Sequence, residues 1–146
     1  MTRVAALIAT VFGVGYAPYA PGTIASLVAL PLAWFAGVNL LPVLALALLL
    51  IGWGAADSVV RHHRIQDPTY VVIDEVAGQC LALLAAPRDF AAYAIGFVAF
   101  RATDILKPWP ASWADRRLTG GFGVMADDFI AAIYAGLIVY LFVLWR

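Results

Sequence analysis

Six apolar stretches follow one another along the chain, and Gly, Pro or charged residues bound or interrupt each of them. Their lengths and limits predict helices over residues 3–13, 23–38, 41–60, 74–86, 90–106 and 127–145. Pro31 is expected to kink the second helix. Turns at Asn39 to Pro42 and at Pro87 to Asp89 are expected to join the second helix to the third and the fourth to the fifth. The pattern predicts an all-α fold.

The lengths of these helices decide which of them can cross a membrane. A spanning helix needs about 20 apolar residues, so residues 41–60 and 127–145 qualify, whereas 74–86 is too short to cross alone. Residues 3–13 are expected to form a re-entrant or interfacial helix. The chain is therefore predicted to be a multi-helical integral membrane protein, with about four to five membrane-embedded helices besides this short N-terminal one.

Composition supports a membrane protein and excludes other classes. Of the 146 residues, 64% are hydrophobic and 12% charged, and the mean hydropathy is +0.92, which lies outside the range of water-soluble domains. The length predicts a single domain over residues 1–146. A net charge of +0 offers no basic surface for nucleic acid. The single cysteine, Cys80, cannot form an intramolecular disulfide and is expected to be a small core residue.

The charged residues predict an orientation. If the chain just beyond residue 60 lies inside, the N-terminus, residues 107–125 and the start of the last helix lie there too. The cations inside would be Arg3, Arg61, Arg64, Arg101, Lys107, Arg116 and Arg117, and those outside only Arg88 and Arg146. The positive-inside rule assigns the richer side to the cytoplasm. The same side receives every carboxylate except Asp89, namely Asp57, Asp67, Asp74, Glu75, Asp104, Asp115, Asp127 and Asp128.

Two acidic pairs, Asp74-Glu75 and Asp127-Asp128, stand at predicted helix starts on that side. Carboxylates that enter an apolar helix are costly unless they are paired or bind a metal. A hard divalent cation such as Mg2+ prefers oxygen ligands and keeps waters that a substrate phosphate can replace. The two pairs are therefore predicted to hold Mg2+. Helix capping with a favourable dipole interaction is the simpler alternative.

A second charged group ends the fifth predicted helix. Arg101, Asp104 and Lys107 recur at every third residue and share one broad helix face, and Pro108 stops the helix after them. Arginine binds phosphate with a bidentate fork and lysine as a point charge, so this face is a candidate phosphate site. The alternative is that both cations snorkel to the membrane surface, with Asp104 as their ion-pair partner.

The segment that follows contains a glycine-rich run, Gly120-Gly121-Phe122-Gly123. Such a run would let backbone amides approach a ligand closely. No His/Cys set with zinc spacing occurs in the sequence. The larger side chains of the surrounding connections are expected at the membrane surface or in solvent, and they are Trp109, Trp113, His62 and His63.

Four motifs occur in order along the chain: APGT-x-x-S at Ala20 to Ser26, DE-x-x-G at Asp74 to Gly78, R-x-x-D-x-x-KPWP at Arg101 to Pro110, and DR-x-x-x-GG-x-G-x-M-x-DD at Asp115 to Asp128. In these motifs and their spacing the chain resembles, over nearly its whole length, the bacterial phosphatidylglycerophosphatase A family of membrane lipid phosphatases. The resemblance implies Mg2+-dependent dephosphorylation of phosphatidylglycerophosphate to phosphatidylglycerol, at the cytoplasmic face of the bacterial inner membrane.

Three positions depart from that family's pattern, and all of them bear on helix packing. Ala25 and Ala132 stand where Gly is usual, and Thr103 stands where an aromatic residue is common. None of these departures removes an ionisable group. Because a change from Gly to Ala mainly limits close backbone approach, the expected chemistry is unaffected.

Residues and resemblance together imply metal-assisted attack on a terminal phosphomonoester. The ligands of Mg2+ would be Asp74, Glu75, Asp127 and Asp128. The cations that stabilise the additional negative charge would be Arg101, Lys107 and either Arg116 or Arg117. Asp104 would orient Arg101 and Lys107, act as general base or serve as nucleophile, and the sequence does not choose among these roles. Thr23 is expected to cap its helix and to offer its hydroxyl or the helix amides to phosphate, with capping alone as the simpler alternative.

Two other functions fit parts of the pattern. A small transporter or channel for an anion or a divalent cation would also use broken helices and charged helix ends. Its polar site should lie near the middle of the membrane, however, whereas the charges here gather on one side. A phosphatase of another lipid, such as phosphatidate, would keep the same chemistry and differ only in the headgroup that it accepts. Neither pattern nor composition predicts an oligomeric state.

Overall fold

A computed structural model describes residues 3–146, and its regular elements are all helical. They are α1 (Arg3–Ala9), the 3-10 helix η1 (Val14–Tyr16), α2 (Pro21–His63), α3 (Ile73–Ala82), α4 (Phe90–Leu106), α5 (Ala111–Arg117) and α6 (Gly120–Trp145). No strand occurs within residues 3–146. The predicted all-α class is therefore confirmed.

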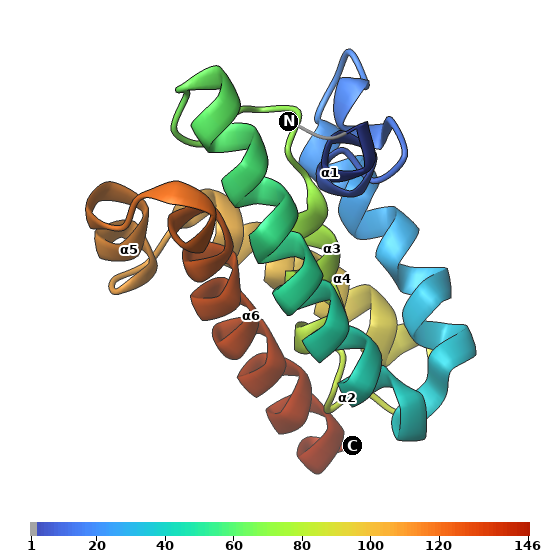
Figure 1. Cartoon of the computed structure of the whole chain (residues 1–146). Coiled ribbons are helices and arrows are strands. Elements are labelled where there is room, and N and C mark those ends of the chain that lie inside the picture. The colour runs from blue at the N-terminus through green and yellow to red at the C-terminus, as the bar shows by residue number, and fades with distance from the viewer. Residues whose placement is uncertain (1–2) are drawn as a thin grey trace.

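Helix α2 consists of two arms that meet at Gly37. Gly37 has φ 64° and ψ 177°, the only non-helical backbone angles inside α2, and glycine adopts positive φ without a steric clash at Cβ. Figure 1 shows the first arm descending and the second arm returning to the level at which the first began. The predicted turn at Asn39 to Pro42 is wrong because the reversal lies at Gly37, and Pro31 leaves the backbone around it helical.

Among the other helices, the predicted boundaries are correct for one and wrong for three. Helix α4 covers the predicted residues 90–106. By contrast, α1 ends at Ala9 instead of residue 13, α3 ends at Ala82 instead of residue 86, and α6 begins at Gly120 instead of residue 127. The short helix α5 was not predicted. Tertiary contacts explain the early start of α6, since side chains from α2 and the connection after it accept hydrogen bonds from the first amides of α6 and offset the poor helix propensity of glycine.

Helix α3 lies at the centre of the molecule, where it contacts α2, α4 and α6. Small side chains allow this close packing. Ala25, Ala29 and Ala33 repeat every fourth residue along the first arm of α2 and are fully buried, which places them on one helix face. Cys80 of α3 packs in the same cluster with no exposed surface, so its expected role as a small core residue is confirmed.

Within residues 3–146, two helices, α2 and α6, are long and apolar enough to cross a membrane. Large apolar side chains on the outside, such as Phe35 and Trp145 at 83% and 86% exposed, suit a lipid environment. The larger number of membrane-embedded helices remains a prediction. Figure 1 places the start of α2, the α2–α3 connection, α5 and the start of α6 at one end, and the C-terminus with the α3–α4 connection at the other.

Candidate active site

A pocket of about 410 Å³ lies at the end of the molecule where the acidic pairs lie. Its walls come from the start of α2, the α2–α3 connection, the start of α3, the end of α4 and the third turn of α6. Eight of the ten predicted site residues line it: Thr23, Asp74, Glu75, Arg101, Asp104, Lys107, Asp127 and Asp128. We call it the charged pocket. Arg116 and Arg117 of α5 are exposed and do not line it.

Three carboxylates converge in the charged pocket. Asp74, Glu75 and Asp128 each offer one oxygen, and these three atoms lie within 4.8 Å of one another. Each of the three also has a buried oxygen without a hydrogen-bond partner, namely Asp74 Oδ1, Glu75 Oε2 and Asp128 Oδ2. Buried, unpaired carboxylate oxygens are costly unless a cation neutralises them. This carboxylate triad therefore fits a hard divalent metal such as Mg2+.

The start of α3 explains how two adjacent acids reach one point. Asp74 and Glu75 occupy the first turn of α3, where the helix dipole favours negative charge. The Val72 amide donates to the Ala9 carbonyl at 2.9 Å and so ties the chain before α3 to the N-terminal segment. Gly22 of α2 lies against the Glu75 carboxylate, and a Cβ at Gly22 would collide with it. Glycine at position 22 thus lets α2 approach the triad.

Asp127 does not join the triad, although it lines the same pocket. Its Oδ2 lies 2.6 Å from Lys107 Nζ, and Lys107 also pairs with Asp115 of α5. Burial lowers the pKa of Lys107, but the hydrogen bonds with Asp115 and Asp127 outweigh it and raise the pKa above its ordinary value. Lys107 is therefore a fixed positive charge at the wall of the pocket. The acidic pair of α6 is thus divided between two tasks.

Arg101 is held in place from two sides. Its Nη1 lies 2.7 Å from Asp104 Oδ2 and donates to Ser26 Oγ at 3.4 Å. The side chains of Arg101 and Asp104 are only 14% and 12% exposed, and the buried Nε of Arg101 has no hydrogen-bond partner. Of the roles predicted for Asp104, orientation of Arg101 is the one that this geometry supports. The role of Ser26 was not predicted, although Ser26 ends the first motif.

The first turn of α2 forms another wall. Ala20, in the left-handed region at φ 44°, precedes the helix without a side-chain cap, so Thr23 lies inside the helix and the expected capping role of Thr23 is wrong. Pro21 suits the first helical position. The amides of Gly22 and Thr23 lie in the first turn, where no intrahelical acceptor exists. Uncapped amides at a helix N-terminus are suited to binding phosphate oxygens.

Asp67 and Thr69 also line the charged pocket, from the α2–α3 connection, and neither was predicted as a site residue. Loss of hydration, followed by the nearby carboxylates Asp115 and Asp104, raises the pKa of Asp67 against the opposing effect of Lys107. The sequence feature that could have identified Asp67 was its position in the short polar connection that leads into α3. Short connections bring their side chains to the ends of the helices that they join.

The glycine-rich run does not face a ligand. The Gly120 amide donates to Gln66 Oε1 at 2.9 Å, and the Gly121 amide donates to Asp57 Oδ1 at 3.1 Å. A Cβ on Gly121 would collide with the backbone of Trp53 and Asp57. The glycines therefore allow α6 to pack closely against the second arm of α2, and the predicted ligand approach is wrong at these residues.

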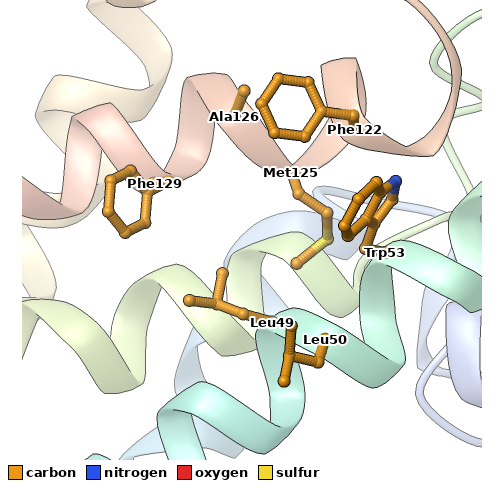
Figure 2. A pocket seen from close by; sticks show the side chains of 7 residues that line it. All are labelled: Leu49, Leu50, Trp53, Phe122, Met125, Ala126 and Phe129. Carbon is orange, nitrogen blue, oxygen red and sulfur yellow. The ribbon is translucent and has the colours of Figure 1, made fainter.

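A different pocket, of about 260 Å³, lies between the second arm of α2 and α6. Figure 2 shows that the labelled side chains in it are apolar, with Met125 and Trp53 at its centre and Phe129 at one side. It contains no carboxylate, cationic or hydroxyl side chain. Phosphate chemistry therefore belongs to the charged pocket.

Buried carboxylates that face an oriented guanidinium and an ammonium group, at one end of an apolar helical bundle, define a phosphate-processing site of a membrane-associated enzyme. The chain belongs to the phosphatidylglycerophosphatase A family, which it matches over residues 7–143. The predicted family is confirmed, and so is the predicted enzyme class, a phosphoric monoester hydrolase.

Two relatives carry the name phosphatidylglycerophosphatase A. The protein of Escherichia coli is 36% identical over 92% of this chain and 80% of its own length. The protein of Haemophilus influenzae is 33% identical over 95% and 88%. A third relative, from Bacteroides thetaiotaomicron, is 37% identical over 91% and 89% and bears the provisional name phosphatidylinositol-3-phosphatase. No solved structure matches the chain.

Proposed function

We propose that the protein is a Mg2+-dependent phosphatidylglycerophosphatase. It hydrolyses the terminal phosphomonoester of phosphatidylglycerophosphate and releases phosphatidylglycerol and phosphate. The observation that carries the proposal is the carboxylate triad of Asp74, Glu75 and Asp128, whose unpaired oxygens share one pocket with Arg101 and Lys107. The names of the Escherichia coli and Haemophilus influenzae relatives support the substrate.

The triad would hold Mg2+, because three carboxylates supply the oxygen ligands that this ion prefers and leave positions for water and phosphate. When bound, the ion would neutralise phosphate oxygens and activate a water for attack on phosphorus. The three buried carboxylates would then no longer carry uncompensated charge. Asp127 is the one predicted metal ligand outside the triad, and it binds Lys107 instead.

The chain's own cations bind the phosphate. Arg101 lines the charged pocket while Asp104 and Ser26 hold its Nη1, so the guanidinium is oriented before substrate arrives. Lys107, fixed by two carboxylates, places a second positive charge on the same pocket. A preorganised pair of cations stabilises the charge that develops on the transferred phosphoryl group without reorientation during the reaction. Asp104 acts as a positioning residue through Arg101.

The location of the site supports an enzyme that takes lipid from one leaflet. We propose a multi-pass protein of the bacterial inner membrane whose charged pocket faces the cytoplasm, as the excess of cations at that end favours. Single cysteines at Ile65, in the α2–α3 connection, and at Pro87, in the α3–α4 connection, test this orientation, because both positions are exposed and the two connections lie at opposite ends of the molecule (Figure 1). In intact cells an impermeant thiol reagent should label Pro87→Cys but not Ile65→Cys, and the reverse result would invert the topology.

The name of one relative favours another phosphomonoester lipid as a second candidate substrate. The provisional name of the Bacteroides thetaiotaomicron relative concerns another phosphomonoester lipid. The triad and the two cations would act on either headgroup, because they contact only the phosphate. Phosphatidate and phosphatidylinositol-3-phosphate should therefore be assayed beside phosphatidylglycerophosphate, and the ratio of kcat/KM values identifies the substrate.

The proposed function is tested by phosphate release from phosphatidylglycerophosphate by the purified protein in detergent. We expect release with Mg2+ and none with excess chelator, and restoration when Mg2+ is returned. Asp89→Asn serves as control, since Asp89 caps α4 at the opposite end of the molecule and asparagine keeps a cap acceptor. Absence of release from a folded sample with any divalent metal would refute the function.

A further inference from the structure

The first arm of α2 and helix α4 run side by side in opposite directions. At one end Arg101 of α4 contacts Ser26 of α2 at 3.4 Å. At the other end the ring of Trp34 lies 5.1 Å from that of Tyr93 and 5.0 Å from that of Phe90. The two helices are therefore antiparallel. We call the line of contact between them the seam, and its first end forms part of the wall of the charged pocket.

A separate pocket, of about 450 Å³, lies at the other end of this seam. It is lined only by side chains of these two helices, among them Leu30, Trp34, Phe35, Phe90 and Ala94. Phe35 and Phe90 are 83% and 82% exposed, so the pocket opens to the surroundings of the bundle. We call it the seam pocket. It has no charged side chain and suits a hydrocarbon chain.

The seam joins the two pockets on common helix faces. Thr23, Leu27, Leu30 and Trp34 recur at intervals of three or four residues on α2, and Phe90, Ala94, Phe97 and Arg101 do so on α4, which aligns each set along one face. The contacts at Ser26 and Trp34 are eight residues apart. At about 1.5 Å per residue the two ends of the seam are separated by about 12 Å.

That separation has the scale of a lipid tail. The hydrocarbon core of a bilayer is about 30 Å thick, so one leaflet provides about 15 Å. A lipid whose terminal phosphate lies in the charged pocket would therefore extend along the seam and bring an acyl chain to the seam pocket.

We propose that the seam pocket binds one acyl chain of the phosphomonoester lipid whose headgroup occupies the charged pocket. The proposal rests on the proposed function and adds a second contact site to it. Binding energy from the chain would hold the headgroup against Arg101 and favour a membrane lipid over a soluble phosphate ester. The enzyme would thus select its substrate at both ends of the molecule.

The pocket of Figure 2 does not lie on this seam. Its lining residues come from the second arm of α2 and from α6, among them Trp53, Met125 and Phe129. The seam is formed instead by the first arm of α2 and by α4, which carry Thr23 and Arg101 of the charged pocket.

The first test compares two synthetic forms of phosphatidylglycerophosphate, one with sixteen-carbon and one with six-carbon chains. Ala94→Phe fills the seam pocket from an exposed position. We expect it to lower kcat/KM for the long-chain form about tenfold, equivalent to about 1.4 kcal/mol, through KM rather than kcat. The short-chain form should change less than twofold. Ala91→Phe, an equally exposed change outside the pocket, is the matched control and should alter neither.

Equal losses on both forms, or no loss on the long-chain form, would overturn the proposal. Leu30→Ala gives an independent variant because it enlarges the pocket and should weaken the discrimination between chain lengths. If the unmodified protein hydrolyses neither form, the proposed function fails, and the seam pocket must then be judged by a measurement that does not depend on turnover.

Photolabelling supplies that measurement. A phosphatidylglycerophosphate with a diazirine near the end of one acyl chain should label residues 30–35 and 90–94 several-fold more than a phosphatidylcholine with the same chain. Ala94→Phe should remove the difference, and Ala91→Phe should keep it. Equal labelling by both lipids would show that bulk lipid fills the seam pocket. Protection from both lipids together with a dimer in solution would assign it to a second copy of the chain. Either result refutes the proposal.

Discussion

The two acidic pairs resemble each other in sequence but differ in the structure. Asp74 and Glu75 lie in the first turn of α3, and both contribute to the carboxylate triad. Asp127 and Asp128 lie in the third turn of α6, where only Asp128 joins the triad and Asp127 binds Lys107. One pair acts as a unit, and the other is divided between a metal site and a cation.

The difference follows from helix geometry and from what lies opposite. Adjacent helical residues point about 100° apart, so two neighbours rarely reach the same ligand. At the start of α3 the longer side chain of Glu75 reaches the same point as Asp74, and Gly22 leaves space for it. In α6 the direction of Asp127 meets Lys107 instead. A pair of acids in a sequence is therefore a weaker indicator of shared ligation than the groups that surround each acid.

The largest effect is expected from Asp128→Asn. Loss of one triad carboxylate should lower kcat about a thousandfold, because a preorganised charge at the reacting group is removed, and should raise the Mg2+ concentration for half-maximal activity more than about a hundredfold. Phosphate release across a Mg2+ titration measures both quantities. Asp89→Asn at the opposite end is the control. Normal metal dependence in Asp128→Asn would remove Asp128 from the ligand set.

A smaller loss is expected from Gly22→Ala, which disturbs the first pair without changing an acid. The added Cβ collides with the Glu75 carboxylate, and this flexible side chain must move away from Asp74. A displacement of about 1 Å near the reacting group costs about a hundredfold in rate. The variant should keep its melting temperature while kcat falls and the requirement for Mg2+ rises. Unchanged activity would show that Glu75 is not needed at its present position.

Asp127→Asn should have a weaker effect than either. Lys107 would keep Asp115 as partner, so the cation stays charged but is less firmly placed, and activity should fall about tenfold. The Mg2+ concentration for half-maximal activity should stay the same, and KM should account for most of the loss. A shift in metal dependence as large as that of Asp128→Asn would show that both members of the pair are ligands.

The smallest effect is expected from Arg116→Gln and Arg117→Gln, separately and together. Both arginines are exposed on α5 and lie outside the lining of the charged pocket, and exposed charges contribute little. Each variant should retain kcat/KM within about twofold of the unmodified protein. A loss comparable to that of Arg101→Gln would restore the phosphate-binding role that the sequence predicts for them.

Several elements follow from local sequence alone. Asp89 caps α4 by accepting from the Ala92 amide at 3.1 Å, Pro108 follows its last residues, and the limits of α4 agree with the prediction. By contrast, the start of α6 depends on Gln66 and Asp57, which are far away in sequence. The reversal at Gly37 was also missed, since two prolines nearby indicated a break more strongly than one glycine did.

By itself the sequence determined the helical class, the apolar character and the gathering of acids and cations at one end, because composition, periodicity and charge order are local properties. The sequence also identified the family, because four motifs occur along the chain in the order and spacing of that family. Only the tertiary structure decided that Asp128 completes the triad, that Asp127 binds Lys107 and that Ser26 contacts Arg101. These pairings join residues on different helices or select between adjacent ones, and side-chain direction after packing decides them.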